Sequence, residues 1–500
     1  MSTLDRVIDQ RGRKLIARAA ERGEEVPSPD NVDGSIQWLR GDGALDAREL
    51  GRYLTEVWKE RADLQEAYPG IFLDPEQRDE FRRWIRDFGA LESGVPTSLL
   101  PPEPTASQLL ETTQPAVSKG ITCLAYHRAV LGVGAAGRRL ANLLEASGEN
   151  VHRRSFDHTT APLTVPFHVD DCGGVRSPRF DVTVLAVNGS EVPLASRALG
   201  ARALRDQYRI GFWAWELENF PDTQQVGFPY VDEVWMNSTF VRDAVRRVAP
   251  PDLPVHAVPF GVDLPVDEMG RPLDPLDPSS KDTVRRRLGL PTGHPLFGYM
   301  FDYASSIERK NPEMAITTFC RAFPKVGEAS LVLKSVNAHL FGETQSQLQA
   351  TIGTRIDVIL IDQVLPSNDV YDFLRCLDGY VSLHRSEGYG MTLLEAMAFG
   401  VPTVATAYSG NLDFMGTANS WLIPYRLVPS RGITHYGNSV WAEPDQTKAI
   451  EALQEIAAGG RSVRERTSQA RRDASRLCDV SAGAQWMADR LESIRSARPH

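Results

Sequence analysis

The sequence predicts an α/β protein in which two doubly wound parallel-sheet domains follow a helical N-terminal region. Three observations predict this fold. The 500 residues exceed what a single hydrophobic core usually serves. From about residue 116, short apolar runs alternate with helical segments, which is typical of a parallel sheet covered by helices on both faces. A polar, proline-rich stretch near residue 270 interrupts this alternation, which then restarts.

Residues 1–115 are predicted to form a helical extension that ends in a proline-bearing linker. In DPEQRDEFRRWIRDFG, a cap at Asp74, a proline at the first position and a stop at Gly89 predict one of its helices. The apolar residues of this helix share one stripe: Phe81, Trp84, Ile85 and Phe88. We expect the stripe to pack on the rest of the chain or on a second subunit, so that the extension would support a homo-oligomer.

The alternating region is predicted to form two domains, residues 116–285 and 286–480, that face each other across a cleft. Strands of the first are expected in ITCLAY, FDVTVLAVN, YRIGFWAW and VDEVWMNS. Strands of the second are expected in PLFGYMFD, ASLVLKS, IDVILID, LDGYVSLH and PTVATA. A closing helix is expected over residues 481–500.

Composition excludes several classes of function. The formal net charge of −10 argues against a nucleic-acid partner, since binding to a phosphate backbone needs a basic face. The five cysteines are scattered and form no C-x-x-C pair, which predicts reduced thiols and a cytoplasmic location. No apolar run approaches the roughly 20 residues of a membrane-spanning helix, so we expect any membrane contact to be peripheral.

The stretch HRSEGYGMTLLEAMAFGVPTVATAYSGN contains the strongest candidate site. A predicted strand ends before it, and a helix follows the Gly-Tyr-Gly turn. The helix N-terminus offers free backbone N–H groups, while Gly388 and Gly390 allow an anion to approach the main chain. Glu387 and Glu395 can flank that anion and accept hydrogen bonds from hydroxyls. The constellation suits a phosphate with sugar hydroxyls on both sides, as in a nucleoside-diphosphate sugar.

Two glutamates separated by seven residues and followed by AMAFGVPTVATAYSGN resemble the donor-binding signature of retaining glycosyltransferases with the GT-B fold, in family four. The resemblance covers roughly residues 120 to 480 and implies hexose transfer to a hydroxyl acceptor such as a glycan or glycolipid. It implies that Glu395 holds the donor ribose and Glu387 the hydroxyls of the transferred sugar. It also gives four residues whose main chain holds the sugar and distal phosphate: Gly388, Tyr389, Gly390 and Met391.

The segment FDYASSIERKNPEMAITTFCRAF supplies Arg309 and Lys310 before a predicted helix. Two cations there could neutralise the charge that grows on a departing diphosphate. Members of the family usually carry an arginine several residues before the lysine, where this sequence has Ala304. Because no carboxylate is placed as a nucleophile, the resemblance implies a front-face mechanism, in which the leaving phosphate oxygen helps to take the acceptor's proton. An exposed, solvated basic pair is the alternative interpretation.

The first domain offers the glycine-rich GVGAAG, residues 132–137, which formally matches a dinucleotide-binding fingerprint. On its own it would suggest a dehydrogenase, but it begins several residues after the strand, and nothing else in the chain supports hydride transfer. In the resembled family, a glycine-rich loop at this place covers the donor phosphates. We expect Gly134 to make the closest approach.

The segment FWAWELENFP ends another first-domain strand with Trp215 and Glu216. Aromatic faces beside carboxylates suit a sugar, and family members often place a histidine at about this position. The alternative is that Trp213 and Trp215 are core residues and Glu216 caps a helix. The nucleotide base would be contacted by the main chain around residues 334–336 and by Val364 and Leu365.

No metal set is evident, because the chain has no D-x-D motif at a strand end and no histidine pair at helical spacing. His384 and His435 are expected to be polar lining, and we expect a metal-independent transfer without a cofactor. Two alternatives remain: a nucleotide-sugar epimerase or phosphorylase of the same architecture, and a protein that binds nucleotide sugars without catalysis.

Overall fold

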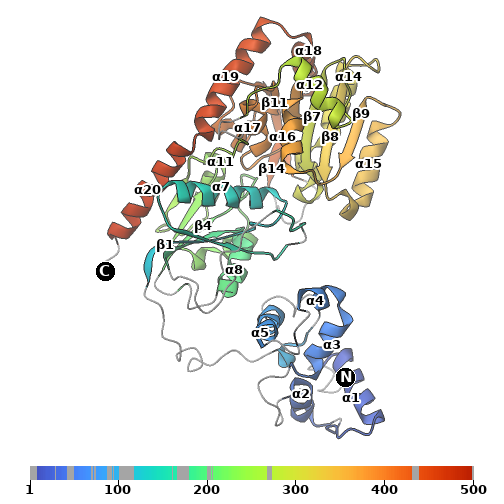
Figure 1. The fold of residues 1–500 in the computed structure, drawn as a ribbon, viewed down its shortest axis with the longest axis vertical. Helices are drawn as coiled ribbons and strands as arrows, with labels where there is room; N and C mark the ends of the chain where they lie inside the picture. The colour runs from blue at the N-terminus through green and yellow to red at the C-terminus, as the bar shows by residue number, and fades with distance from the viewer. Residues whose placement is uncertain are drawn as a thin grey trace. The chain divides into compact units, whose positions relative to one another are not determined.

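The computed structural model describes residues 8–28, 30–41, 50–68, 71, 75–86, 93, 95–100, 117–159, 161–165, 180–199, 204, 207–266, 273–430 and 439–497. The chain divides into two compact units, residues 1–114 and 115–500. The elements of each unit are drawn in Figure 1. Of the predicted features, the helix ends at Asp74 and Gly89, the linker residues 101–107 and His435 lie outside the described residues.

The unit of residues 1–114 is helical, as predicted. Its helices are α1 (Gln10–Glu21), α2 (Val32–Arg40), α3 (Arg52–Glu60), α4 (Ala62–Ala67), α5 (Pro75–Trp84) and the 3-10 turn η3 (Thr97–Leu99). Asp9 caps α1 by accepting a hydrogen bond from the Gly12 N–H. Phe81 and Ile85 are fully buried in this unit's own core. Phe81 and Ile85 thus pack on other parts of the chain, within the helical unit itself, which is one of the two expected alternatives. Packing on a second subunit stays a prediction, and Phe88 lies outside the described residues.

The second unit begins with a lobe built on a six-stranded parallel sheet, here the first lobe. The strands lie in the order β2-β1-β3-β4-β5-β6. They are β1 (Ser118–Ala125), β2 (Val151–Ser155), β3 (Phe180–Ala186), β4 (Tyr208–Phe212), β5 (Glu233–Met236) and β6 (Val255–Ala257). The accompanying helices include α7 (Gly132–Ala146), α8 (Val192–Leu199), α10 (Asp222–Gln225) and α11 (Thr239–Arg246).

The second lobe contains another six-stranded parallel sheet, in the order β12-β11-β10-β7-β8-β9. Its strands are β7 (Leu296–Asp302), β8 (Ser330–Val336), β9 (Val358–Asp362), β10 (Gly379–Ser382), β11 (Thr403–Thr406) and β12 (Trp421–Ile423). Its helices and 3-10 turns include α12 (Pro278–Arg287), η6 (Tyr303–Ser305), α13 (Ile307–Lys310), α14 (Pro312–Ala322), α15 (Gly342–Ile352), α16 (Ser367–Arg375), α17 (Met391–Ala398), η8 (Gly410–Asp413) and α18 (Gln446–Ala458). An antiparallel pair, β13 (Tyr425–Pro429) and β14 (Val440–Pro444), follows. The two predicted doubly wound sheets are confirmed.

Two long helices close the chain and connect the lobes. Helix α19 (Arg461–Cys478) packs on α17 of the second lobe, and α20 (Val480–Ala497) packs on α7 of the first lobe, so the chain ends on the lobe with which this unit begins (Figure 1). Arg490 Nε lies 2.9 Å from Glu233 Oε1, and Arg495 binds both Asp181 and Glu149 at 2.6 Å. These ion pairs fix α20 to the first lobe.

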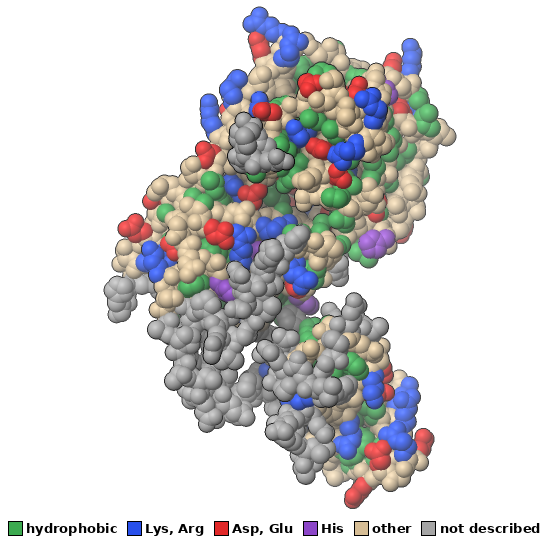
Figure 2. All heavy atoms as spheres, viewed as in Figure 1, with side chains coloured by type: hydrophobic (Ala, Val, Ile, Leu, Met, Phe, Trp, Pro, Cys, Tyr) green, Lys and Arg blue, Asp and Glu red, His purple; other side chains and the backbone are tan. Residues whose placement is uncertain are grey.

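The structure locates the charged side chains at the surface and the cysteines among the described residues. Figure 2 shows acidic and basic side chains interspersed over the coloured part of the visible face, without an extended basic surface there. Four cysteines in the described ranges are free: Cys123, Cys320, Cys376 and Cys478. Within those ranges, no helix combines the length and apolarity that a membrane crossing requires.

Candidate active site

The candidate site lies where the strand order of the second sheet reverses. Strands β8 and β9 extend the sheet on one side of β7, while β10, β11 and β12 extend it on the other. At such a switch point the connections leave two neighbouring parallel strands in opposite directions, and ligands bind beyond their carboxyl ends. The segment after β7 carries Arg309 and Lys310, and the segment after β10 carries Glu387. The topology therefore brings together the predicted cations and carboxylate.

The connection after β7 is held in a special backbone conformation. Ser306 and Asn311 have φ values of 61° and 55° on either side of the single turn α13, although neither is a glycine. Asn311 Nδ2 donates to the carbonyl O of Leu383 at 2.9 Å, and the Tyr299 hydroxyl donates to the carbonyl O of Lys310 at 2.6 Å. These bonds fix the turn that presents Lys310.

Glu387 forms the centre of a charged cluster. Its Oε1 lies 2.6 Å from Lys310 Nζ, and its Oε2 lies 3.5 Å from Arg309 Nη1. Burial by itself would raise the pKa of this carboxyl, but the charges of Lys310 and Arg309 outweigh burial and lower the pKa to about 2. Glu387 is therefore ionised at neutral pH and can accept hydrogen bonds from hydroxyl groups.

Arg309 has a different environment from Lys310. It is only 2% exposed, and its guanidinium donates to the carbonyl oxygens of Ser386 at 2.8 Å and Ser305 at 2.9 Å. Besides its contact with Glu387, the guanidinium lies 3.7 Å from the carboxylate of Glu216 in the first lobe. This arrangement makes Arg309 a holder of the loop before Glu387, whereas Lys310 keeps a partly exposed ammonium group.

Helix α17 begins at the predicted Gly-Tyr-Gly turn. Gly390 has a φ of 93°, a left-handed value that favours glycine, and Met391 is the first helical residue. A Cβ atom at Gly388 would collide with the carbonyl O of Trp215, so this glycine permits close approach of the first lobe. The Tyr389 hydroxyl accepts a hydrogen bond of 3.1 Å from the Gly261 N–H. The turn therefore contacts the first lobe as well as opening α17.

Glu395 lies in α17 and is partly buried. Within the described part of the chain, its carboxyl group has no hydrogen-bond or ion-pair partner. Burial, with a further contribution from the negative charge of Asp263, raises its pKa to about 8. A carboxyl group in this situation would be stabilised in its charged form by a ligand that donates hydrogen bonds.

The glycine-rich segment of the first lobe is helical, so the expectation of a loop at residues 132–137 is wrong. These residues form the first turns of α7. A Cβ atom at Gly134 would lie 2.7 Å from the carbonyl O of Tyr126 and 2.8 Å from that of Ala129, so Gly134 packs against its own connection. A Cβ atom at Gly132 would lie 3.9 Å from Met391 Cε. Of these two glycines, Gly132 is the one that lies beside Met391 of α17, and the approach of Gly134 to donor phosphates stays a prediction.

Trp215 and Glu216 differ from each other in their surroundings. Trp215 is buried, its Nε1 donates to the carbonyl O of Asn219 at 2.8 Å, and its ring meets Phe220 edge to face. Trp213 is also buried and stacks on Phe220. The alternative that both tryptophans are core residues is therefore correct. Glu216 is not a helix cap; its carboxylate faces Arg309 across the junction between the lobes.

The expected base-contacting residues lie at the carboxyl ends of β8 and β9. Lys334, in β8, is buried, and burial lowers the pKa of its ammonium group. Val364 and Leu365 lie between β9 and α16, and Val364 is exposed. His384 is fully buried and its pKa is lowered by burial, while its Nδ1 lies 3.0 Å from Ser382 Oγ. Contacts of residues 334–336, Val364 and Leu365 with a nucleotide base stay a prediction.

Sequence reasoning missed three residues that touch the site. Ser409 Oγ accepts a hydrogen bond of 2.7 Å from the Glu387 N–H, and Ser409 itself has a φ of 80°. The negative charge of Asp263, in the first lobe, raises the pKa of Glu395. Ser238 donates to the carbonyl O of Gly388. The AYSGN motif signalled the first, but no local pattern marks the other two, since they come from distant segments.

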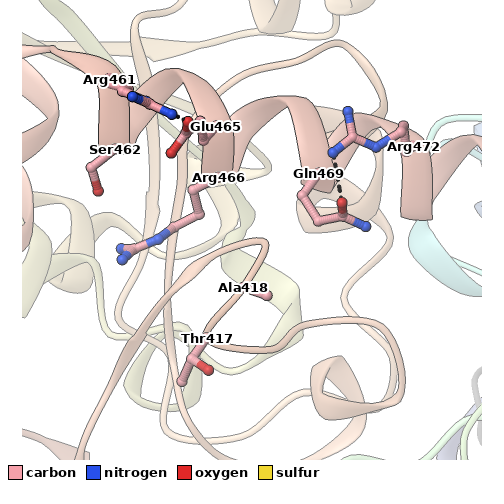
Figure 3. Close-up of a pocket in the computed structure, with 8 residues that line it drawn as sticks. All are labelled: Thr417, Ala418, Arg461, Ser462, Glu465, Arg466, Gln469 and Arg472. Carbon is pink, nitrogen blue, oxygen red and sulfur yellow. Dashed lines mark hydrogen bonds and ion pairs between the residues drawn. The ribbon is translucent and has the colours of Figure 1, made fainter.

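An open depression also lies between α19 and the segment that precedes β12 (Figure 3). Its lining residues are Thr417, Ala418, Arg461, Ser462, Glu465, Arg466, Gln469 and Arg472. Arg461 pairs with Glu465 at 2.6 Å, and Arg472 donates to Gln469 at 2.6 Å. None of the predicted site residues lines this depression. Among the described residues, no three His, Cys, Asp or Glu side chains are grouped as a metal site.

Comparison with known proteins shows what the segment that carries these residues is similar to. Residues 303–430, which include Lys310, Glu387 and Glu395, match the family model of glycosyl transferases group 1. A D-inositol 3-phosphate glycosyltransferase from Catenulispora acidiphila is 31% identical over 210 residues, which are 40% of this chain and 45% of the relative. The chain thus matches less than half the length of this curated relative.

Solved structures show the same fold at low identity. A sucrose-phosphate synthase from Thermosynechococcus elongatus has a TM-score of 0.54 and 16% identity, and covers 76% of this chain and 100% of its own. HepE from Anabaena, solved with UDP and glucose, has a TM-score of 0.53 and 15% identity, and covers 75% and 100%. The predicted GT-B fold and the resemblance to group 1 glycosyltransferases are confirmed.

Proposed function

We propose that this chain, whose residues 303–430 are a group 1 glycosyltransferase segment, transfers a hexose from a nucleoside-diphosphate sugar to a hydroxyl acceptor with retention of anomeric configuration. The observation that carries the proposal is the arrangement at the switch point. Lys310 pairs with Glu387 beside the N-terminus of α17, and the carboxyl of Glu395 has no partner among the residues that the structure describes. Glu387 and Glu395 can accept hydrogen bonds from hydroxyl groups, and Lys310 and the N-terminus of α17 attract a diphosphate.

Each residue has a definite task in this reaction. The Glu395 carboxylate accepts hydrogen bonds from the ribose hydroxyls, and Glu387 accepts them from the hydroxyls of the transferred sugar. Lys310 and the free N–H groups at the start of α17 bind the diphosphate. The Gly132 end of α7, which approaches Met391, covers this region from the first lobe.

The transfer itself exchanges one bond at the anomeric carbon. The bond from that carbon to the diphosphate oxygen breaks, and the acceptor oxygen forms its bond from the same face. The acceptor's proton passes to the departing phosphate oxygen. Lys310 and the α17 N-terminus stabilise the negative charge as it grows, which lowers the barrier most when the charge is largest. The proposed reaction requires no metal or cofactor.

The proposed donor and acceptor rest on what the similar proteins are named for, and the proposed location rests on the cysteines. The complexes of HepE with UDP and UDP-glucose favour a UDP-sugar over a GDP-sugar as the first donor to test. The relative from Catenulispora is named for a phosphorylated polyol acceptor, which supports a hydroxyl acceptor such as a glycan, glycolipid or other glycoconjugate intermediate. The free cysteines support a reducing cytoplasmic location, with any membrane contact peripheral.

The decisive experiment has two stages. A thermal-shift panel of UDP- and GDP-sugars first identifies the donor, since a ligand at a hundred times its dissociation constant stabilises by about 2.7 kcal/mol. NMR then follows the donor with candidate acceptors. Release of nucleoside diphosphate that depends on acceptor, with a product of unchanged anomeric configuration, is expected. Acceptor-independent conversion of the donor would favour an epimerase, and an inverted product would contradict retention.

A further inference from the structure

The backbone of Glu387 is held by a turn of the chain far from its own strand. Its backbone N–H donates to Ser409 Oγ at 2.7 Å, and its carbonyl O accepts from the Gly410 N–H at 2.9 Å. Gly410 opens the 3-10 turn η8, which ends at Asp413. The position of Glu387 therefore depends on where η8 is held.

Helix α11 of the first lobe begins beside both segments. Ser238, the cap of α11, is 1% exposed, and its hydroxyl donates to the carbonyl O of Gly388 at 2.6 Å. The Ser238 hydroxyl oxygen also accepts a hydrogen bond of 3.2 Å from the Val241 N–H. One hydroxyl therefore caps the start of α11 and holds the Gly-Tyr-Gly turn at Gly388. The neighbouring Thr239 N–H donates to Asp413 Oδ2 at 2.7 Å, and its hydroxyl also contacts the Asp413 carboxylate.

These contacts leave the turn little room to move. A Cβ atom at Gly388 would collide with the Trp215 carbonyl O, and one at Gly410 would collide with the Gly388 carbonyl O. The backbones at Trp215, Gly388 and Gly410 thus lie in direct contact, so a shift of α11 moves the turn as a unit. The start of a single first-lobe helix contacts the residue after Glu387 and also the 3-10 turn that supports Glu387.

We propose that Ser238 and Thr239 are positioning residues that set the carboxylate of Glu387 for the transferred sugar from the opposite lobe. The consequence for catalysis rests on the proposed function, whereas the positioning itself is a property of the free protein. We call the contacts of Ser238 with Gly388 and of Thr239 with Asp413 the clamp. Nucleotide affinity depends also on Glu395, which the clamp does not contact, so we expect the clamp to affect turnover more than affinity. The rate of sugar transfer depends on the position of the Glu387 carboxylate and therefore on the clamp.

The test compares Ser238→Ala with two matched variants. Ser238→Thr keeps a hydroxyl that can donate to Gly388 and accept from Val241. Val241→Ala removes buried side-chain volume from the same helix turn and leaves the Ser238 contact to Gly388 in place, so it controls for general loosening of α11. Hydrogen exchange followed by mass spectrometry on the free protein reports on the peptides that cover residues 385–391 and 408–414.

In Ser238→Ala we expect exchange in these peptides to accelerate about fivefold, the change that corresponds to one lost hydrogen bond. Ser238→Thr should restore protection, and Val241→Ala should accelerate exchange in α11 alone. Unchanged exchange in Ser238→Ala, or equal acceleration in Val241→Ala, would overturn the positioning. In the kinetic assay, Ser238→Ala should lower kcat about fivefold or more while UDP affinity changes less than twofold.

The two readouts separate failure of this inference from failure of the proposed function. If the parent protein turned over no nucleotide sugar, the proposed function would fail while the exchange result still decided the positioning. If the parent were active and Ser238→Ala equalled it in kcat, the role of the clamp in transfer would be refuted.

Discussion

Nucleotide binding should release a proton from Glu395. In the free protein, burial raises the pKa of this carboxyl to about 8, so about nine in ten molecules carry the proton at pH 7. Ribose hydroxyls that donate to the carboxylate would stabilise its charged form and lower the pKa towards the ordinary value of 4.5. We therefore expect binding of UDP at pH 7 to release about 0.9 proton per molecule.

Isothermal titration calorimetry in phosphate, HEPES and Tris buffers measures this release. The observed enthalpy should change with the buffer's ionisation enthalpy, and the slope gives the number of protons. Because a proton is released, affinity should rise nearly tenfold per pH unit between about pH 6 and 7 and level off above about pH 8.

Two variants make the calorimetric result specific. Glu395→Gln removes the titrating group and should abolish the Glu395 part of the slope, whereas Glu387→Gln should retain it. UDP's own phosphate contributes equally to parent and variants, so the difference between parent and Glu395→Gln is the quantity of interest. A difference near zero would refute the assignment of Glu395 to the ribose.

The remaining predictions concern Lys310, Glu387 and metal ions. Lys310→Ala should lower kcat about a hundredfold or more, with a smaller loss of donor affinity, in steady-state turnover beside calorimetric binding. Because the folded pKa of Glu387 is about 2, below its ordinary 4.5, its ion pairs should stabilise the fold by about 3 kcal/mol above pH 4.5. That contribution is lost as pH falls from 4.5 to 2, and urea unfolding of Glu387→Gln should lack this part of the pH dependence. Turnover should survive dialysis against EDTA; loss that a divalent cation restores would contradict the metal-independent mechanism.

The sequence was sufficient to predict the fold and to place Lys310 and Glu387 after strands of the same sheet, whereas the ion pair between them was not predicted. Both residues follow strands of a parallel sheet, and the carboxyl ends of neighbouring parallel strands meet at one edge. The glycines around Tyr389 likewise predicted the start of α17. These predictions succeeded because each depends on strand order, helix caps and turn chemistry, which local sequence largely determines.

Other features depend on packing between distant segments and were missed or misassigned. Arg309 is buried and Lys310 is partly exposed although they are neighbours, because the short helix α13 directs them differently. Residues 132–137 were expected to form a loop but open α7, where the missing Cβ of Gly134 makes room for two carbonyl groups of its own lobe. Ser238 lies 150 residues from Gly388, so only the folded structure brings them together.

Helix α20 has a consequence for the order in which the protein is made. The first lobe is encoded early in the second unit, but Trp486 meets Trp235 edge to face at 5.1 Å, and Arg490 and Arg495 neutralise carboxylates on that lobe. During synthesis on the ribosome, the first sheet emerges more than two hundred residues before this helix. The residues of the first lobe that α20 contacts therefore stay uncovered by this helix while the second lobe is translated and folds. The last helix completes the earlier lobe, which makes its maturation a late event in biosynthesis.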